Sequence, residues 1–117
     1  DALAAYSYKT AQRVRAKSII CITRDGNTAL RLSSFQIELP IIAITFKEQT
    51  VQKLKMIRGI YSIFLPLEPS NDKIFDVIFS SLLSKTWLKK NDKIVLVTVT
   101  TSTVSDTASN LFMIHEL

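Results

Sequence analysis

The chain of 117 residues has the length of one domain and carries a formal net charge of +5. Hydrophobic residues make up 47% and charged residues 21%, which is the composition of a folded globular protein and excludes a disordered chain. The single cysteine, Cys21, excludes an internal disulfide and suits a reducing compartment. No apolar run approaches the roughly 20 residues that span a bilayer, and no signal-peptide pattern opens the chain, so we expect no membrane partner.

Helix and strand patterns alternate along the whole chain. Apolar residues at helical spacing predict helices at about 1–15, 28–35, 48–57 and 70–86. Short, apolar, β-branched runs predict strands at 18–23, 41–45, 60–64, 93–99 and 110–116. Gly59 is expected to end the third helix as its C-cap glycine, and Ser70 to cap the start of the fourth.

This order of elements predicts an α/β fold. Strands that alternate with helices form βαβ units, so we expect a three-layer α/β/α sandwich with a five-stranded, mainly parallel sheet. The last strand follows its neighbour through a loop alone, which indicates an antiparallel strand. The helices are predicted to point the following residues inward: Leu32, Phe35, Val51, Leu54, Ile57, Ile74, Ile78 and Leu82.

The loop after the first strand is a candidate phosphate site. It consists of Thr23, Arg24, Asp25, Gly26, Asn27 and Thr28. Free N–H groups at a helix N-terminus attract phosphate, two threonine hydroxyls can donate hydrogen bonds, and the arginine adds positive charge. The alternative is that Asp25 or Asn27 merely caps the helix while Gly26 serves the turn. The spacing alone leaves both interpretations open, because short glycine motifs are weak signals.

The loop after the fourth strand, predicted over residues 100–109, is rich in hydroxyl groups. Thr101, Ser102, Thr103 and Ser105 are candidate effector-loop residues, although the same composition fits a flexible surface loop.

No catalytic constellation is visible in the sequence. His115 is the only histidine, so neither a metal cluster nor a proton relay is expected, and a place on the strand surface or at an interface suits it better. Cys21 lies in an apolar strand and is predicted to be a core residue. Asp72 and Asp76 are one helical turn apart, and a solvated helix surface accounts for them. Basic residues are scattered, with the densest group at residues 85–93, which favours a solvated surface over a nucleic-acid site.

Several segments, taken in order, resemble the C-terminal domain of pyruvate kinases. Residues 19–29 are similar to the strand and effector loop of that family, in which a threonine, two variable residues and a small-residue turn precede Ser/Thr-Ala. The other similar segments are 40–45, 48–50, 58–61, 88–95, 110–111 and 114–115. The match covers nearly the whole chain and weakens at residues 65–71 and 100–109.

The resemblance implies one domain over residues 1–117, a fragment without the catalytic barrel. In the family this domain binds an allosteric effector, often fructose 1,6-bisphosphate, another sugar phosphate or AMP, and forms part of the tetramer interface. The fragment itself is then no enzyme and needs no cofactor. The parent chain would be a glycolytic phosphotransferase that moves a phosphoryl group from phosphoenolpyruvate to ADP, with Mg²⁺ and K⁺ in its catalytic domain.

The resemblance also implies partners and a compartment. The expected partners are a sugar-phosphate or nucleotide effector, the parent's own catalytic domain and further copies of the chain, with a dimer for the fragment and a tetramer for the parent. Neither nucleic acid nor membrane is expected, and the compartment is the cytoplasm or an organelle.

Two departures from the family keep an alternative open. Animal and fungal enzymes hold the second phosphate partly with an arginine on the long helix, and the matching residue here is Ile74. Their last loop is glycine-rich, whereas residues 100–109 contain no glycine. The alternative is therefore an assembly-only module that has lost effector binding. A separate nucleotide-binding enzyme of doubly wound type is the weakest hypothesis, because the catalytic residues are missing.

Overall fold

Helices and strands alternate in the predicted order. The structure is a computed structural model that describes residues 2–34, 38–66, 73–85, 88–101 and 108–117. Its helices are α1 (Ala2–Val14), α2 (Asn27–Ser33), α3 (Glu48–Leu54) and α4 (Ile74–Lys85). Its strands are β1 (Ser18–Ile22), β2 (Ile41–Thr45), β3 (Ile60–Phe64), β4 (Lys93–Thr101) and β5 (Ala108–Glu116).

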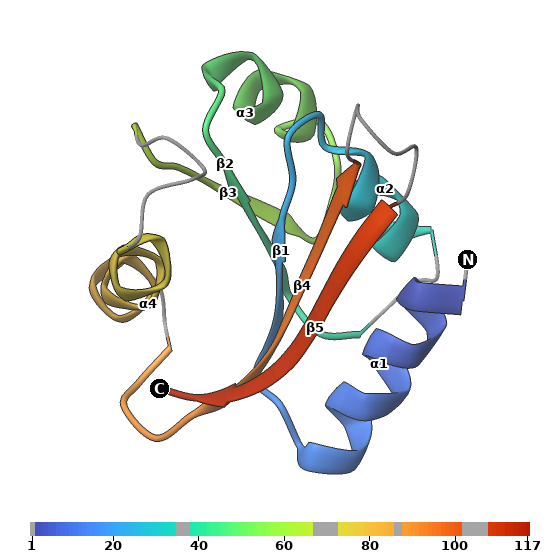
Figure 1. Cartoon of the computed structure of the whole chain (residues 1–117), viewed down its shortest axis with the longest axis vertical. Helices are drawn as coiled ribbons and strands as arrows, with labels where there is room; N and C mark the ends of the chain where they lie inside the picture. Colours follow the sequence, from blue (N-terminus) through green and yellow to red (C-terminus); the bar gives the residue numbers. More distant parts are fainter. Residues whose placement is uncertain (1, 35–37, 67–72, 86–87, 102–107) are drawn as a thin grey trace.

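The strands form one five-stranded sheet with the order β3-β2-β1-β4-β5. β1 is parallel to both β2 and β4, and β2 is parallel to β3. β5 is antiparallel to β4, with Val95 opposite Ile114. In Figure 1 the sheet lies between α1 and α2 on one side and α4 on the other. The predicted three-layer fold, with an antiparallel last strand, is confirmed.

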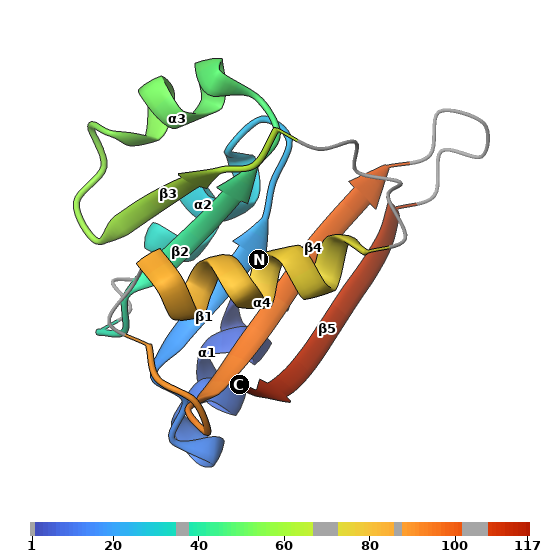
Figure 2. The same cartoon turned by 90° about the vertical axis from the view of Figure 1, so that its left-hand side faces the viewer.

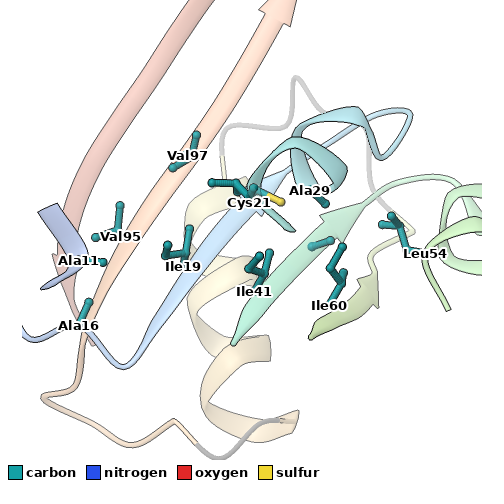
Figure 3. Close-up of a cluster of buried hydrophobic side chains, with 12 residues drawn as sticks. Ala11, Ala16, Ile19, Cys21, Ala29, Ile41, Leu54, Ile60, Val95 and Val97 are labelled. Carbon is teal, nitrogen blue, oxygen red and sulfur yellow. The ribbon is translucent and has the colours of Figure 1, made fainter. Parts of the chain in front are cut away.

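The central strands are buried on both faces, as the continuous apolar runs predict. On one face, alternate side chains of β1, β2 and β4 pack against small residues of the helices (Figure 3). Ala11 of α1 and Ala29 of α2 are almost fully buried there, which lets both helices lie close to the strands. Leu54 of α3 completes this cluster, so α1, α2 and α3 contribute to the same core.

The opposite face of the sheet is covered by α4 (Figure 2). Ile78 and Leu82 are fully buried against Ile20, Ile42 and other strand residues of that face. Ile74, the third residue predicted to point inward, is half-buried and packs against the same cluster. One helical stripe therefore closes this core, as the 3.6-residue spacing predicts.

α3 is shorter than the sequence pattern predicts. The helix ends at Leu54 with Lys55 as its C-cap, so Ile57 lies in the turn beyond it. Gly59 is not the C-cap glycine: it has a φ of +86° in the turn that enters β3, where its carbonyl accepts the N–H of Ile41 at 3.1 Å. The apolar spacing extends to Ile57 because the chain makes one more helix-like turn after α3. In this turn the N–H of Ile57 donates a hydrogen bond to the carbonyl of Leu54.

The two last strands are longer than predicted, and the loop between them is shorter. Thr101 is the end of β4 and pairs with Ala108, the first residue of β5. The sequence predicted a loop at these strand ends because their residues are polar, although their backbones pair as strands.

Six residues named in the sequence analysis lie outside the described ranges. They are Phe35, the proposed cap Ser70, Asp72, Ser102, Thr103 and Ser105. None of the helices in the described ranges is long and apolar enough to cross a membrane.

Candidate functional site

The strand order creates a topological switch point between β1 and β4. β1 continues into α2 on one face, while β4 is entered from α4 on the other. In open parallel sheets, ligands bind outside the carboxyl ends of the strands at such a point. The loop that follows β1, residues 23–28, lies there, which is where the sequence predicted a site.

The loop is held by a hydrogen bond between the Thr23 hydroxyl and the Gly26 backbone rather than by a helix-capping side chain. Gly26 is the N-cap of α2, with a φ of +88° and no side-chain cap. Its N–H donates a hydrogen bond of 2.9 Å to Oγ1 of the buried Thr23. The alternative that Asp25 or Asn27 caps the helix is therefore wrong, because a left-handed glycine occupies the cap position and Asn27 is already helical.

α3 supports the loop from the neighbouring strand connection. The Thr50 hydroxyl donates to the carbonyl of Arg24 at 2.7 Å, and Lys53 Nζ donates to the carbonyl of Asp25 at 2.9 Å. Gly26 is also packed closely, because a Cβ at this position would lie 3.2 Å from Cδ2 of Leu54. Sequence reasoning missed both donors, since they follow another strand. The parallel pairing of β1 with β2 is the signal that brings the two loops together.

One carboxylate at this site, that of Asp25, lies beside a lysine. Arg24 is exposed, and Lys47 Nζ lies 3.8 Å from Oδ1 of Asp25, with side chains 50% and 60% exposed. Exposed pairs of this kind are worth at most about 1 kcal/mol, so the lysine remains available to another anion. Thr28 is half-buried, and its hydroxyl has no hydrogen bond to another described residue. The arrangement can take an anion, with Asp25 as an internal competitor.

The remaining candidates lie away from this loop. Cys21 is fully buried, and burial raises the pKa of its thiol to about 12, so it is a core residue and no nucleophile at neutral pH. His115 is half-buried on β5, and its ring stacks on Phe79 of α4 with centroids 3.8 Å apart. Across the described ranges, no group of three or more His, Cys, Asp or Glu residues is placed to hold a metal ion.

Comparison with known proteins identifies the class of domain that this fold and loop define. A family model described as "Pyruvate kinase, alpha/beta domain" matches residues 1–115. The chain belongs to this family of pyruvate kinase α/β domains.

Relatives from two organisms show how much of a longer protein the chain matches. It is 28% identical to pyruvate kinase of Eimeria tenella over 97 residues, which is 83% of this chain and 18% of the relative. It is 27% identical to pyruvate kinase of Clostridium acetobutylicum over 111 residues, 95% of this chain and 24% of the relative. The chain thus spans less than a quarter of the length of these curated relatives.

A solved structure agrees with the fold over nearly the whole chain. Cryptosporidium parvum pyruvate kinase in complex with ADP superposes with a TM-score of 0.83 and 26% sequence identity. The match covers 98% of this chain and 23% of that structure. The fold of this chain is therefore that of a pyruvate kinase α/β domain.

Proposed function

We propose that this chain is the effector-binding and oligomerisation domain of a pyruvate kinase. The phosphoryl transfer from phosphoenolpyruvate to ADP, with its Mg²⁺ and K⁺, belongs to the catalytic part of the parent chain. The domain contributes no catalytic residue and acts indirectly. An effector with different affinities for two quaternary states shifts their balance, and the distant active site follows.

The loop at residues 23–28 is the observation that carries the proposal. It lies at the switch point of the sheet and includes the exposed Arg24. Two lysines of the α3 segment, Lys47 and Lys53, contact it, and the Thr28 hydroxyl is free to donate. These groups suit the phosphate of a sugar phosphate or a nucleotide. The α4 arginine of the animal and fungal enzymes has no counterpart here, because the matching residue is Ile74. This side chain packs against the core instead. A monophosphate therefore fits this site better than a bisphosphate.

The subunit contact is proposed at β5. This strand is an edge of the sheet, and an unpaired edge invites pairing with another chain. Ile114 is 48% exposed, whereas Val95 opposite it on β4 is fully buried. The difference arises because α1 packs on β1 and β4 and leaves β5 uncovered on this face. An apolar edge of this kind suits a dimer of the domain and a tetramer of the parent. The compartment that we propose is the cytoplasm or an organelle.

A thermal-shift titration tests the effector site. The panel consists of fructose 1,6-bisphosphate, ribose 5-phosphate, glucose 6-phosphate, AMP and inorganic phosphate. A ligand of the folded state must raise the melting temperature in a saturable way. Thr28→Val and Arg24→Ala should abolish the shift, and Lys9→Ala on α1 is the control. Thr23 is unsuitable as a probe because its hydroxyl holds the loop through the N–H of Gly26.

The second candidate function is an assembly-only module. The carboxylate of Asp25 beside Lys47 and the apolar Ile74 favour it, because both weaken a phosphate site. The thermal-shift panel separates the two hypotheses, because both predict a dimer by size-exclusion chromatography. A stable dimer that shows no thermal shift with any member of the panel supports the assembly-only module. A saturable shift that depends on Thr28 contradicts it.

A further inference from the structure

Basic residues that are far apart in the sequence meet at the amino ends of β1 and β4. Arg13 is in the last turn of α1, Arg15 has a φ of +58° in the turn that follows, and Lys17 precedes β1. The N–H of Lys17 donates a hydrogen bond of 2.9 Å to the carbonyl of Lys93, the first residue of β4. The end of α1 is therefore fixed beside the start of β4 (Figure 1).

The turn before β4 adds two further lysines to this place. The N–H of Lys89 donates to Oδ2 of Asp92 at 2.9 Å, and the N–H of Asp92 donates to the carbonyl of Lys89 at 3.1 Å. Asn91 takes a left-handed φ of +77° to close the turn. We call the resulting surface the basic edge, and its six exposed members are Arg13, Arg15, Lys17, Lys89, Lys90 and Lys93.

Basic residues that are scattered along the sequence are thus gathered at this end of the sheet. Among the residues that the structure describes, none forms an ion pair with a side chain of the basic edge. Like charges held close together repel one another, and an oppositely charged surface relieves that repulsion. Two carboxylates, those of Asp92 and Glu116, lie among the cations, the second on β5 opposite Lys93.

We propose that the basic edge is a docking surface for an acidic protein surface. Charge complementarity favours a partner rich in Asp and Glu, whose attraction would steer the encounter. The two carboxylates argue against a nucleic acid, because its uninterrupted row of phosphates would be held against them. The basic edge lies at the opposite end of β1 from residues 23–28, so the proposal is independent of effector binding.

Fluorescence anisotropy with a labelled acidic peptide, in which glutamates alternate with serines, tests this surface on the 117-residue chain. Lys89→Glu with Lys90→Glu should lower the affinity by about tenfold, and the loss should shrink as salt is added. Lys17→Glu, from a distant part of the sequence, should lower it as well, since the fold brings it beside Lys93. The charge-matched control is Lys55→Glu with Arg58→Glu, two exposed residues near the other edge of the sheet. Thermal unfolding verifies that each variant folds.

Three outcomes would overturn the proposal. The first is an equal loss of affinity in the control variant, which would mean that only net charge matters. The second is tighter binding of a DNA duplex with the same charge as the peptide, which would point to a nucleic-acid surface. The third is no detectable binding of the peptide at low ionic strength.

Discussion

The Thr50 hydroxyl of α3 donates a hydrogen bond of 2.7 Å to the carbonyl of Arg24, a residue 26 positions earlier in the chain. Together with Lys53, it ties the helix that follows β2 to the loop that follows β1. The conformation of the candidate site thus depends on a helix that contributes none of the residues predicted for it.

Replacing Thr50 by valine keeps the volume and removes this donor. The carbonyl of Arg24 loses a partner, so we expect a loss of about 1 kcal/mol in unfolding free energy. Urea denaturation measures the change. Thr10→Val on α1 is the control, because the Thr10 hydroxyl has no hydrogen bond to any other residue that the structure describes. Equal stability of the two variants would contradict a role for Thr50 in holding the loop.

The two glycines separate backbone strain from packing. Both have a left-handed φ, +88° at Gly26 and +86° at Gly59, so alanine at either position should cost about 1–2 kcal/mol. A Cβ at Gly26 would also press on Leu54 at 3.2 Å, whereas a Cβ at Gly59 meets open space. Gly26→Ala should therefore destabilise the domain more than Gly59→Ala in chemical denaturation. Equal losses would show that Leu54 moves aside freely, and the reverse order would contradict the packing argument.

Asp25 should weaken anion binding at the loop. If the proposed effector site is correct, Asp25→Asn removes a competing carboxylate and raises the affinity for inorganic phosphate by about two- to fivefold, the range of exposed charge pairs. Isothermal titration calorimetry measures the affinity. Glu116→Gln changes the net charge equally at the far end of the sheet and should have little effect. A fall in affinity for Asp25→Asn would mean that the carboxylate positions the site instead.

Two adjacent leucines of α4 test the core on that face. Leu82 is fully buried, so Leu82→Ala should cost about 2–5 kcal/mol by leaving a cavity. Leu83 is 41% exposed, and Leu83→Ala should cost less than about 1 kcal/mol. Denaturant unfolding measures the free energy of unfolding of each variant. Because both variants replace leucine by alanine in the same helix, the change in helix propensity is the same in the two. Similar losses would mean that α4 covers the sheet differently.

The buried thiol gives a pH dependence of known sign. Burial raises the pKa of Cys21 from 9.0 to about 12, so the folded state holds the proton more tightly than the unfolded state. Its contribution to stability is complete below pH 9 and is lost as the pH rises from 9 towards 12. Stability curves of the native chain and Cys21→Ala should differ in slope only in this window. The thiol should react with a disulfide reagent at pH 8 only after denaturation, and rapid reaction of the folded chain would contradict its burial.

The sequence by itself determined the layers and most of the elements. Strands at residues 41–45 and 60–64 begin and end where predicted, because a buried parallel strand is a continuous apolar run bounded by turn residues. The inward stripe of α4, with Ile78 and Leu82, follows from helical periodicity alone. The position of the candidate loop also follows from the sequence, since the carboxyl end of a strand is a local feature.

Only the tertiary structure decided what surrounds that loop and where charge collects. Thr50 and Lys53 reach residues 24 and 25 because β1 and β2 are parallel neighbours, and no local spacing encodes that contact. In the same way, the pairing of β1 with β4 brings Lys17 beside Lys93. Contacts of this kind depend on strand order, which the chain acquires only when non-local pairing buries its two cores.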